Sequence, residues 1–166
     1  RFDDRWAQVR SAAQRPQARF WINMEDGFAA LLPHLTKFRS VAQYLRLRST
    51  ALLADGQSDA ALEEVMLSFR VVDALRNEPT LISQLVRISG IHLTLSTVWE
   101  GLAAHRWNDA QLATIEQELA KTDLLADYQT GMAGERYCGI WTVDFVHRTG
   151  DVNALGGRGE PEQYTL

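Results

Sequence analysis

The sequence predicts an all-α fold, and three observations support that prediction. Hydrophobic residues recur at spacings of three and four along most of residues 28–150, which is the period of an amphipathic helix. No sustained alternation of β-branched residues indicates a strand. Glycine, proline and helix-capping residues divide the chain between the periodic segments. We therefore expect a single-domain antiparallel helical bundle, an array of αα-hairpins with about five main helices.

The chain is predicted to have three parts. Residues 1–27 form an N-terminal arm with a short helix near residues 2–14, and the cluster Phe20-Trp21-Ile22 folds back onto the core. Residues 28–150 form the helical domain. Residues 151–166 are rich in glycine and are predicted to be a flexible tail.

The first two main helices are predicted at residues 33–54 and 58–76, the first beginning at about Phe28 or Pro33. Asp55-Gly56 ends the first helix, because glycine suits a left-handed C-terminal cap. The turn with its following small residue, Ala61, resembles a tetratricopeptide-type hairpin. A plain αα-hairpin is the alternative, since no second copy follows at a period of 34 residues.

Three further helices are predicted at residues 79–105, 108–121 and 124–148. Pro79 is placed for a first-turn proline, and Asn108 with Gln111 resembles a capping box. Asp123 precedes the last helix, and Gly150 follows it. These signals predict the helix ends more sharply than periodicity does.

The helix at residues 79–105 is the most apolar of the predicted helices. Its hydrophobic side chains cover about two-thirds of the circumference, which predicts a central, buried helix. The rest of its surface consists mostly of small side chains, and one stripe of the last helix does too. We expect close contact between these two helices along the two small stripes, which are Ser83, Gly90, Thr94, Thr97 and Gly101, and Gly131, Gly134, Cys138 and Thr142.

Composition excludes several classes of protein. Hydrophobic residues make up 46% and charged residues 23%, which argues against disorder. The one cysteine, Cys138, excludes an internal disulfide framework. No apolar run approaches the roughly 18 residues of a membrane span, and no signal peptide is recognisable.

The charge is uneven along the chain. Residues 1–48 hold nine basic against four acidic residues, and residues 49–166 hold eight against seventeen. The basic helix at residues 33–54 could bind nucleic acid or an anionic surface. It could equally pack beside the acidic helix that follows, and the net charge of −4 favours this second interpretation.

No catalytic, cofactor-binding or metal-ligating set is predicted. The sequence has no Gly-x-Ser-x-Gly elbow, phosphate-binding loop, dinucleotide fingerprint or zinc-protease motif. The four histidines are scattered, and Asp144 with His147 gives only one of the pairs that a di-iron bundle needs. Cys138 has no activating neighbours and is interpreted as structural.

Four polar residues at the contact between the last helix and the helix at residues 79–105 form the candidate site. Gln84 lies within an apolar arc, Arg87 borders it, and Glu135 and Arg136 follow a glycine on the last helix. A buried charge needs a partner, so Arg87 is predicted to pair with Glu135. The four side chains form either an internal brace or a polar ligand pocket, and the brace is favoured.

Several segments resemble a family of uncharacterised bacterial all-helical proteins. The similar segments, within residues 15–140, are Pro33–Ser40, Asn77–Ile88, Val98–Leu102 and Gly134–Arg136. The resemblance implies a helical domain that follows an N-terminal membrane anchor, with this chain as a soluble part outside the cytoplasm. It implies no site residues.

The leading functional prediction is a non-enzymatic interaction or scaffolding domain of an envelope-associated protein. It would bind protein partners or itself through a groove or through exposed aromatic residues such as Trp6 and Trp21. A small-molecule-binding or enzymatic bundle using the polar residues is the alternative. Nucleic-acid binding by the basic helix is the third interpretation, and no nucleic-acid partner or cofactor is expected.

Overall fold

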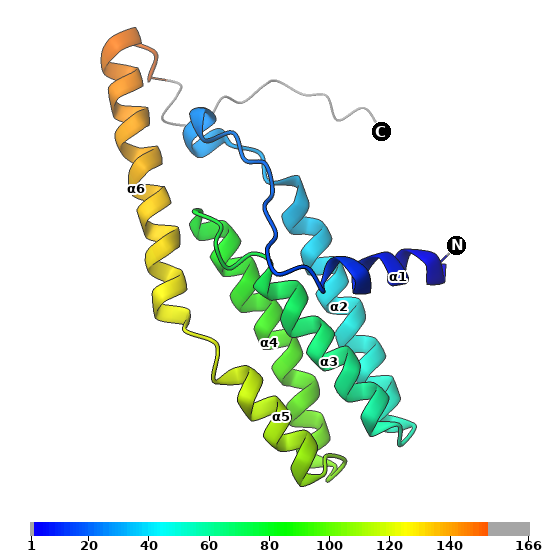
Figure 1. The fold of residues 1–166 in the computed structure, drawn as a ribbon. Helices are drawn as coiled ribbons and strands as arrows, with labels where there is room; N and C mark the ends of the chain where they lie inside the picture. Colours follow the sequence, from blue (N-terminus) through cyan, green and yellow to red (C-terminus); the bar gives the residue numbers. More distant parts are fainter. Residues whose placement is uncertain (1, 153–166) are drawn as a thin grey trace.

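The computed structural model describes residues 2–152 and confirms the all-α fold (Figure 1). No strand occurs within that range. The predicted tail at residues 151–166 lies almost wholly outside the described residues. The elements, in chain order, are α1 (Phe2–Ala12), the 3-10 helix η1 (Met24–Ala29), α2 (Pro33–Ala54), α3 (Ser58–Asp73), α4 (Leu81–Ala103), α5 (Asp109–Leu119) and α6 (Leu124–Thr149).

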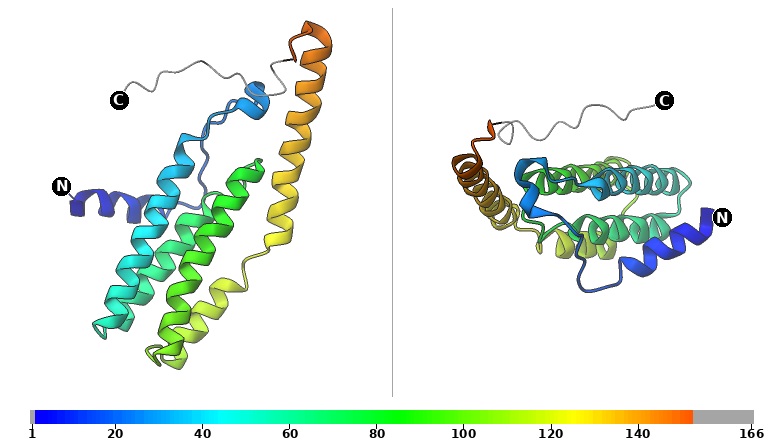
Figure 2. Two further views of the ribbon diagram at one scale, coloured as in Figure 1. Left: turned by 180° about the vertical axis from the view of Figure 1, so that it is seen from behind. Right: turned by 90° about the horizontal axis from the view of Figure 1, so that it is seen from above.

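Helices α2, α3 and α4 form an antiparallel three-helix unit, and the other helices pack around it (Figures 1 and 2). Helix α5 packs on α3 near the lower end of the unit in Figure 1. Helix α6 touches the beginning of α4 and then extends past it to contact η1. Seen from behind, α4 lies in front, with α2 and α6 on either side (left panel of Figure 2).

The helix ends follow the predicted capping signals with one exception. Gly56 adopts a left-handed φ of 76° after α2, and Gly150 ends α6 with a φ of 71°. Asn108 and Gln111 form the complete capping box of α5. The exception is α4, which begins at Leu81 rather than Pro79, because the Thr80 side chain accepts a hydrogen bond from the Ser83 amide and caps the helix there.

The core consists of two apolar clusters on opposite faces of the α2–α3 hairpin. One joins the end of α2 to α3, α4, α5 and Trp107. The other lies under α1, whose Trp6 ring stacks on Tyr44 at a centroid distance of 4.0 Å. The prediction that the arm folds back onto the core is confirmed for Phe20, which stacks on His34, but not for Trp21, which is exposed.

The two predicted small stripes are both largely buried, but they do not face each other along their length. A Cβ added at Gly134 would lie 1.5 Å from the Pro79 carbonyl oxygen, so α6 does approach the beginning of α4 closely. Further along α4, a Cβ at Gly90 would meet Val72 of α3, and one at Gly101 would meet Trp107. The small stripe of α4 therefore serves mainly the contacts with α2 and α3.

The prediction that α4 would bury its apolar arc is wrong. Helix α4 is central, yet its buried residues are mostly polar or small, including Ser83, Gln84, Arg87 and Thr94. Buried hydroxyl pairs replace apolar packing there. Ser68 Oγ and Thr94 Oγ1 lie 2.7 Å apart, and the Ser49 hydroxyl donates to Thr97 Oγ1 at 3.1 Å. Small side chains allow the helices to approach closely, and the larger apolar side chains consequently point outward.

Candidate functional site

The predicted polar residue Arg87 lies at the junction of α3, α4 and α6. Its side chain is 1% exposed, and its guanidinium donates to Asp73 Oδ1 at 2.7 Å and to Asp127 Oδ2. Arg76 also pairs with Asp127, at 3.1 Å between Nε and Oδ1. The prediction that Arg87 pairs with Glu135 is wrong, because Asp127 lies one turn into α6, where that helix passes Arg87. Nothing in the local sequence indicated that pairing.

Gln84 and Glu135 hold the turn between α3 and α4. The Gln84 amide donates to the carbonyls of Arg76 at 3.1 Å and Glu78 at 2.9 Å, both of which lie in the turn after α3. Glu135 Oε1 accepts a hydrogen bond from the Leu81 amide at 3.0 Å, at the start of α4. Arg136, the fourth predicted residue, is exposed and is not part of this network.

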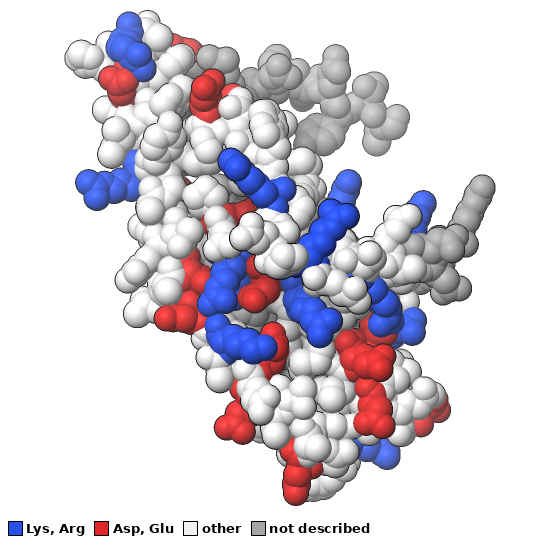
Figure 3. All heavy atoms as spheres, viewed as in Figure 1, with Lys and Arg blue, Asp and Glu red and all other residues white. Residues whose placement is uncertain are grey.

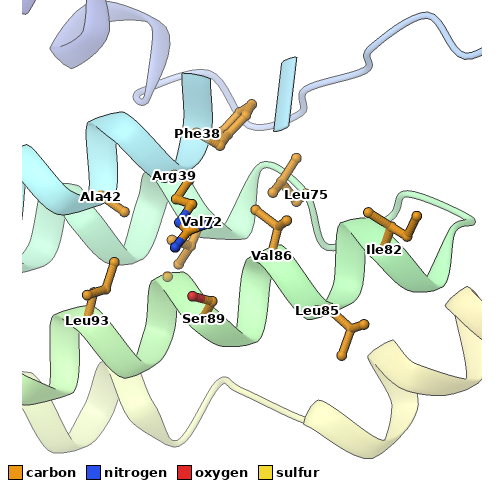
Figure 4. Close-up of a pocket in the computed structure, with 11 residues that line it drawn as sticks. Phe38, Arg39, Ala42, Val72, Leu75, Ile82, Leu85, Val86, Ser89 and Leu93 are labelled. Carbon is orange, nitrogen blue, oxygen red and sulfur yellow. The ribbon is translucent and has the colours of Figure 1, made fainter. Parts of the chain in front are cut away.

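Two cavities in the structure are lined by residues other than this polar set. One, of about 260 Å³, is an apolar crevice between α2 and α4, shown in Figure 4 with Arg39 at its edge. The other, of about 800 Å³, lies between the arm and residues 77–79. Gln84, Arg87 and Glu135 line neither one. The polar atoms of these three side chains instead bind groups of α3, the α3–α4 turn and α6, which are the contacts that the internal-brace interpretation predicts.

Two observations concern the metal-binding and nucleophilic side chains of the described residues. They contain no group of three or more His, Cys, Asp or Glu side chains that could hold a metal ion. Burial raises the pKa of the Cys138 thiol, and the nearby Glu135 carboxylate raises it further. A thiol in this setting stays protonated at neutral pH and is a poor nucleophile.

The basic residues of α2 are partly neutralised by acidic neighbours. Arg48 donates to Glu64 of α3 at 2.9 Å, and Arg10 of α1 pairs with the same buried carboxylate. Arg46 Nη2 lies 3.7 Å from Oε1 of Glu100 on α4. On the face shown in Figure 3, basic and acidic side chains adjoin one another. This supports the interpretation that α2 packs beside acidic helices.

The most prominent surface feature is an apolar stripe along the outer side of α4. Its members alternate in spacing by four and three residues, which places them on one side of a helix. Trp99 is 71% exposed and Leu85 is 55% exposed. Figure 4 shows Leu85 pointing away from α2, on the side of α4 toward α6. The stripe consists of Leu81, Leu85, Ile88, His92, Leu95, Trp99 and Leu102.

Helix α6 continues the apolar surface beside the first half of this stripe. Gly131 packs against Leu81 and Gln84, and Asp127 against Arg87, which fixes how α6 is turned. At 100° per residue, this orientation puts one side of α6 next to the α4 stripe. We call the combined surface the α4–α6 face; its large exposed side chains are Leu85, Ile88, Leu95, Trp99, Leu102, Leu125, Tyr128 and Met132.

The prediction that no segment approaches a membrane span is wrong by length and composition, because helix α4 meets both criteria, with 44% of its most apolar window buried in the fold. Core helices of soluble proteins meet the same criterion. The buried Arg87 lies on this helix, and its ion pairs with Asp73 and Asp127 tie the helix to α3 and α6. Its apolar character is therefore concentrated on one side.

Comparison with known proteins adds no family. No model of a protein family, no curated protein and no solved structure matches this chain. The resemblance to bacterial all-helical proteins stays a prediction.

Proposed function

We propose that this chain is a non-enzymatic helical interaction domain that binds another protein through the α4–α6 face. The observation that supports this most is the outward orientation of the apolar stripe on α4. Contiguous apolar patches larger than a few hundred Å² are rare on monomeric proteins and mark interaction sites when they occur.

The composition of the face fits a protein interface. Its exposed members are leucine, isoleucine, methionine, tyrosine and tryptophan, with His92 as the one titratable side chain in the α4 stripe. The centres of protein interfaces are depleted in charge and enriched in aromatic residues and methionine. Trp99 is the residue of this face best suited to be a binding hot spot.

The internal brace gives the face a fixed shape. Arg87 joins Asp73 and Asp127, and Gly131 and Gly134 let α6 lie directly on the beginning of α4. The two apolar surfaces are thereby held side by side before a partner arrives. A preorganised surface loses less conformational entropy on binding. The contacts that form the brace therefore also hold the two parts of the binding face next to each other.

Two finer parts of the interpretation belong to the proposal. The tetratricopeptide-like turn between α2 and α3 is supported by Ala61, which is fully buried five residues after Gly56 and lets the two helices nest. Association with the cell envelope rests on the family resemblance. Neither is needed for binding through the α4–α6 face.

Site-specific photo-crosslinking in the native cell tests the proposal. A photoreactive phenylalanine analogue replaces Trp99 or Met132 on the face, or the exposed Gln117 on α5 as the matched control. We expect defined protein adducts from positions 99 and 132, lost when Leu95→Lys is added, and none from position 117. Absence of adducts at 99 and 132, or the same adducts at all three positions, would contradict the proposal.

A further inference from the structure

We infer that the occupant of the α4–α6 face is a second copy of this chain, bound with the two α4 helices antiparallel. The inference rests on the proposed function and names its partner. It follows from the spacing of the α4 stripe, from the difference between its two halves and from the area of the face.

The stripe has the repeat of a two-helix seam. Leu81, Ile88, Leu95 and Leu102 are separated by seven residues each, and the other three members lie between them at a spacing of four and three. This is the a/d pattern with which two helices pack side chains of one into gaps of the other. The first and last members span roughly 32 Å at 1.5 Å per residue.

The two halves of the stripe differ in a complementary way. The first half, around Leu81 and Leu85, lies beside α6, where the exposed side chains of Tyr128 and Met132 widen the apolar surface. The second half lies beyond the contact with α6 and carries the most exposed large side chain of the stripe, Trp99. A parallel pair would place the two wide halves against each other, whereas an antiparallel pair packs Trp99 of each copy against the wide half of the other.

This arrangement fixes the pairing of side chains. With Trp99 of one copy opposite Leu81 of the other, Leu95 lies opposite Leu85, and His92 opposite Ile88. The twofold axis then passes near the middle of α4, and each contact occurs twice, as an isologous interface requires. No acidic or basic side chain of the stripe other than His92 is brought to the axis, so charge does not oppose self-pairing.

The area of the face is sufficient for a stable dimer. Its eight large side chains are between 36% and 71% exposed. Taking roughly 200 Å² for a fully exposed large side chain, they present on the order of 800 Å². A standard stable interface buries about 800 Å² per partner. The α4 stripe alone presents less than this area, so the interface also requires the side chains of α6.

Sedimentation equilibrium at micromolar concentrations tests the inference on the whole 166-residue chain. We expect a dimer for the wild type, and a monomer for Leu95→Lys and for Leu85→Glu. Gln43→Lys, an exposed position on α2, should remain dimeric. Circular dichroism checks that each variant keeps its helical content. A monomeric wild type would overturn the inference.

The double variant Leu85→Glu/Leu95→Lys tests the antiparallel pairing. In the antiparallel dimer each Glu opposes a Lys of the other copy, so the double variant should again dimerise, with its association weakened by added salt. In a parallel dimer like charges meet, and the double variant would stay monomeric, which would contradict the pairing.

The other occupants of the face give different results. A monomer that crosslinks through position 99 to a different protein would overturn the dimer while leaving the proposed function intact. A monomer that floats with phosphatidylcholine–phosphatidylglycerol vesicles, and loses this with Leu95→Lys, would overturn both in favour of a membrane surface. A wild-type dimer unaffected by either single substitution would place the interface elsewhere and also overturn the inference.

Discussion

The inner and outer sides of α4 reverse the usual arrangement of a central helix. The inner side carries Arg87, Gln84, hydroxyl groups and glycines, and it packs closely on α2 and α3. The outer side carries leucines, isoleucine and a tryptophan, which remain exposed. The comparison teaches that close approach and hydrogen bonding can hold a helix in place, while its larger apolar side chains remain available for another surface.

The largest expected effect tests the inner side at Arg87. Arg87→Met should lower the free energy of unfolding by roughly 3–5 kcal/mol, because it leaves the buried Asp127 carboxylate without its nearest partner. Arg136→Met, on the exposed part of α6, is the matched control and should change stability by less than about 0.5 kcal/mol. Urea unfolding measures both, and equal effects would contradict the brace.

Two glycines of α6 sharpen the claim of close approach. Gly134→Ala should destabilise the fold by about 1–3 kcal/mol or more, because its Cβ would meet the Pro79 carbonyl. Gly139→Ala, whose Cβ would come no closer than 3.9 Å to Phe28, should stabilise the helix by up to about 1 kcal/mol. Thermal unfolding of the pair measures the difference. Tolerance of Gly134→Ala would show that α6 does not lie directly on the α3–α4 turn.

The hydroxyl pairs of the inner side predict a smaller effect. Ser68→Ala should cost about 1 kcal/mol, since it removes the hydrogen-bond partner of Thr94. Thr114→Ala, on the exposed side of α5, should cost less than about 0.5 kcal/mol. Chemical denaturation distinguishes the two. An equal cost would mean that the buried pair adds nothing to the packing of α3 on α4.

The smallest expected effect concerns Cys138, which alkylation should modify slowly in the folded protein at pH 7. Its pKa is raised by burial, so the reactive thiolate forms only at higher pH. Because the folded state holds this proton more tightly than the unfolded state, the contribution to stability is lost as the pH rises through the alkaline range. Rapid reaction at pH 7, at the rate of the urea-unfolded chain, would contradict a buried thiol.

Local signals in the sequence predicted the helices well. Gly56, the Asn108–Gln111 capping box, Asp123 and Gly150 act on backbone groups within one turn, and the structure confirms each of them. The start of α4 was misplaced by two residues because Thr80 competes with Pro79 for the role of first-turn signal, and the Thr80 hydroxyl caps the helix.

The orientation of α4 could not be predicted in the same way. Its sequence carries two stripes at helical spacing, one apolar and one small and polar, and periodicity alone does not tell which faces inward. The choice depends on partners far away in the chain: Ser49, Ser68, Val72 and Asp127. The burial of Gln84 and Arg87 could be anticipated, but not the carbonyls and carboxylates that they bind.

Chemical modification of two engineered cysteines tests the reversed orientation of α4 most directly. In a Cys138→Ala background, Trp99→Cys and Thr97→Cys place a thiol on opposite sides of the same turn, at positions that are 71% and 0% exposed. At protein concentrations low enough to favour the monomer, position 99 should react at nearly the rate of the unfolded chain, and position 97 should be strongly protected. Rapid modification at position 97 with protection at position 99 would show that α4 buries its apolar side after all.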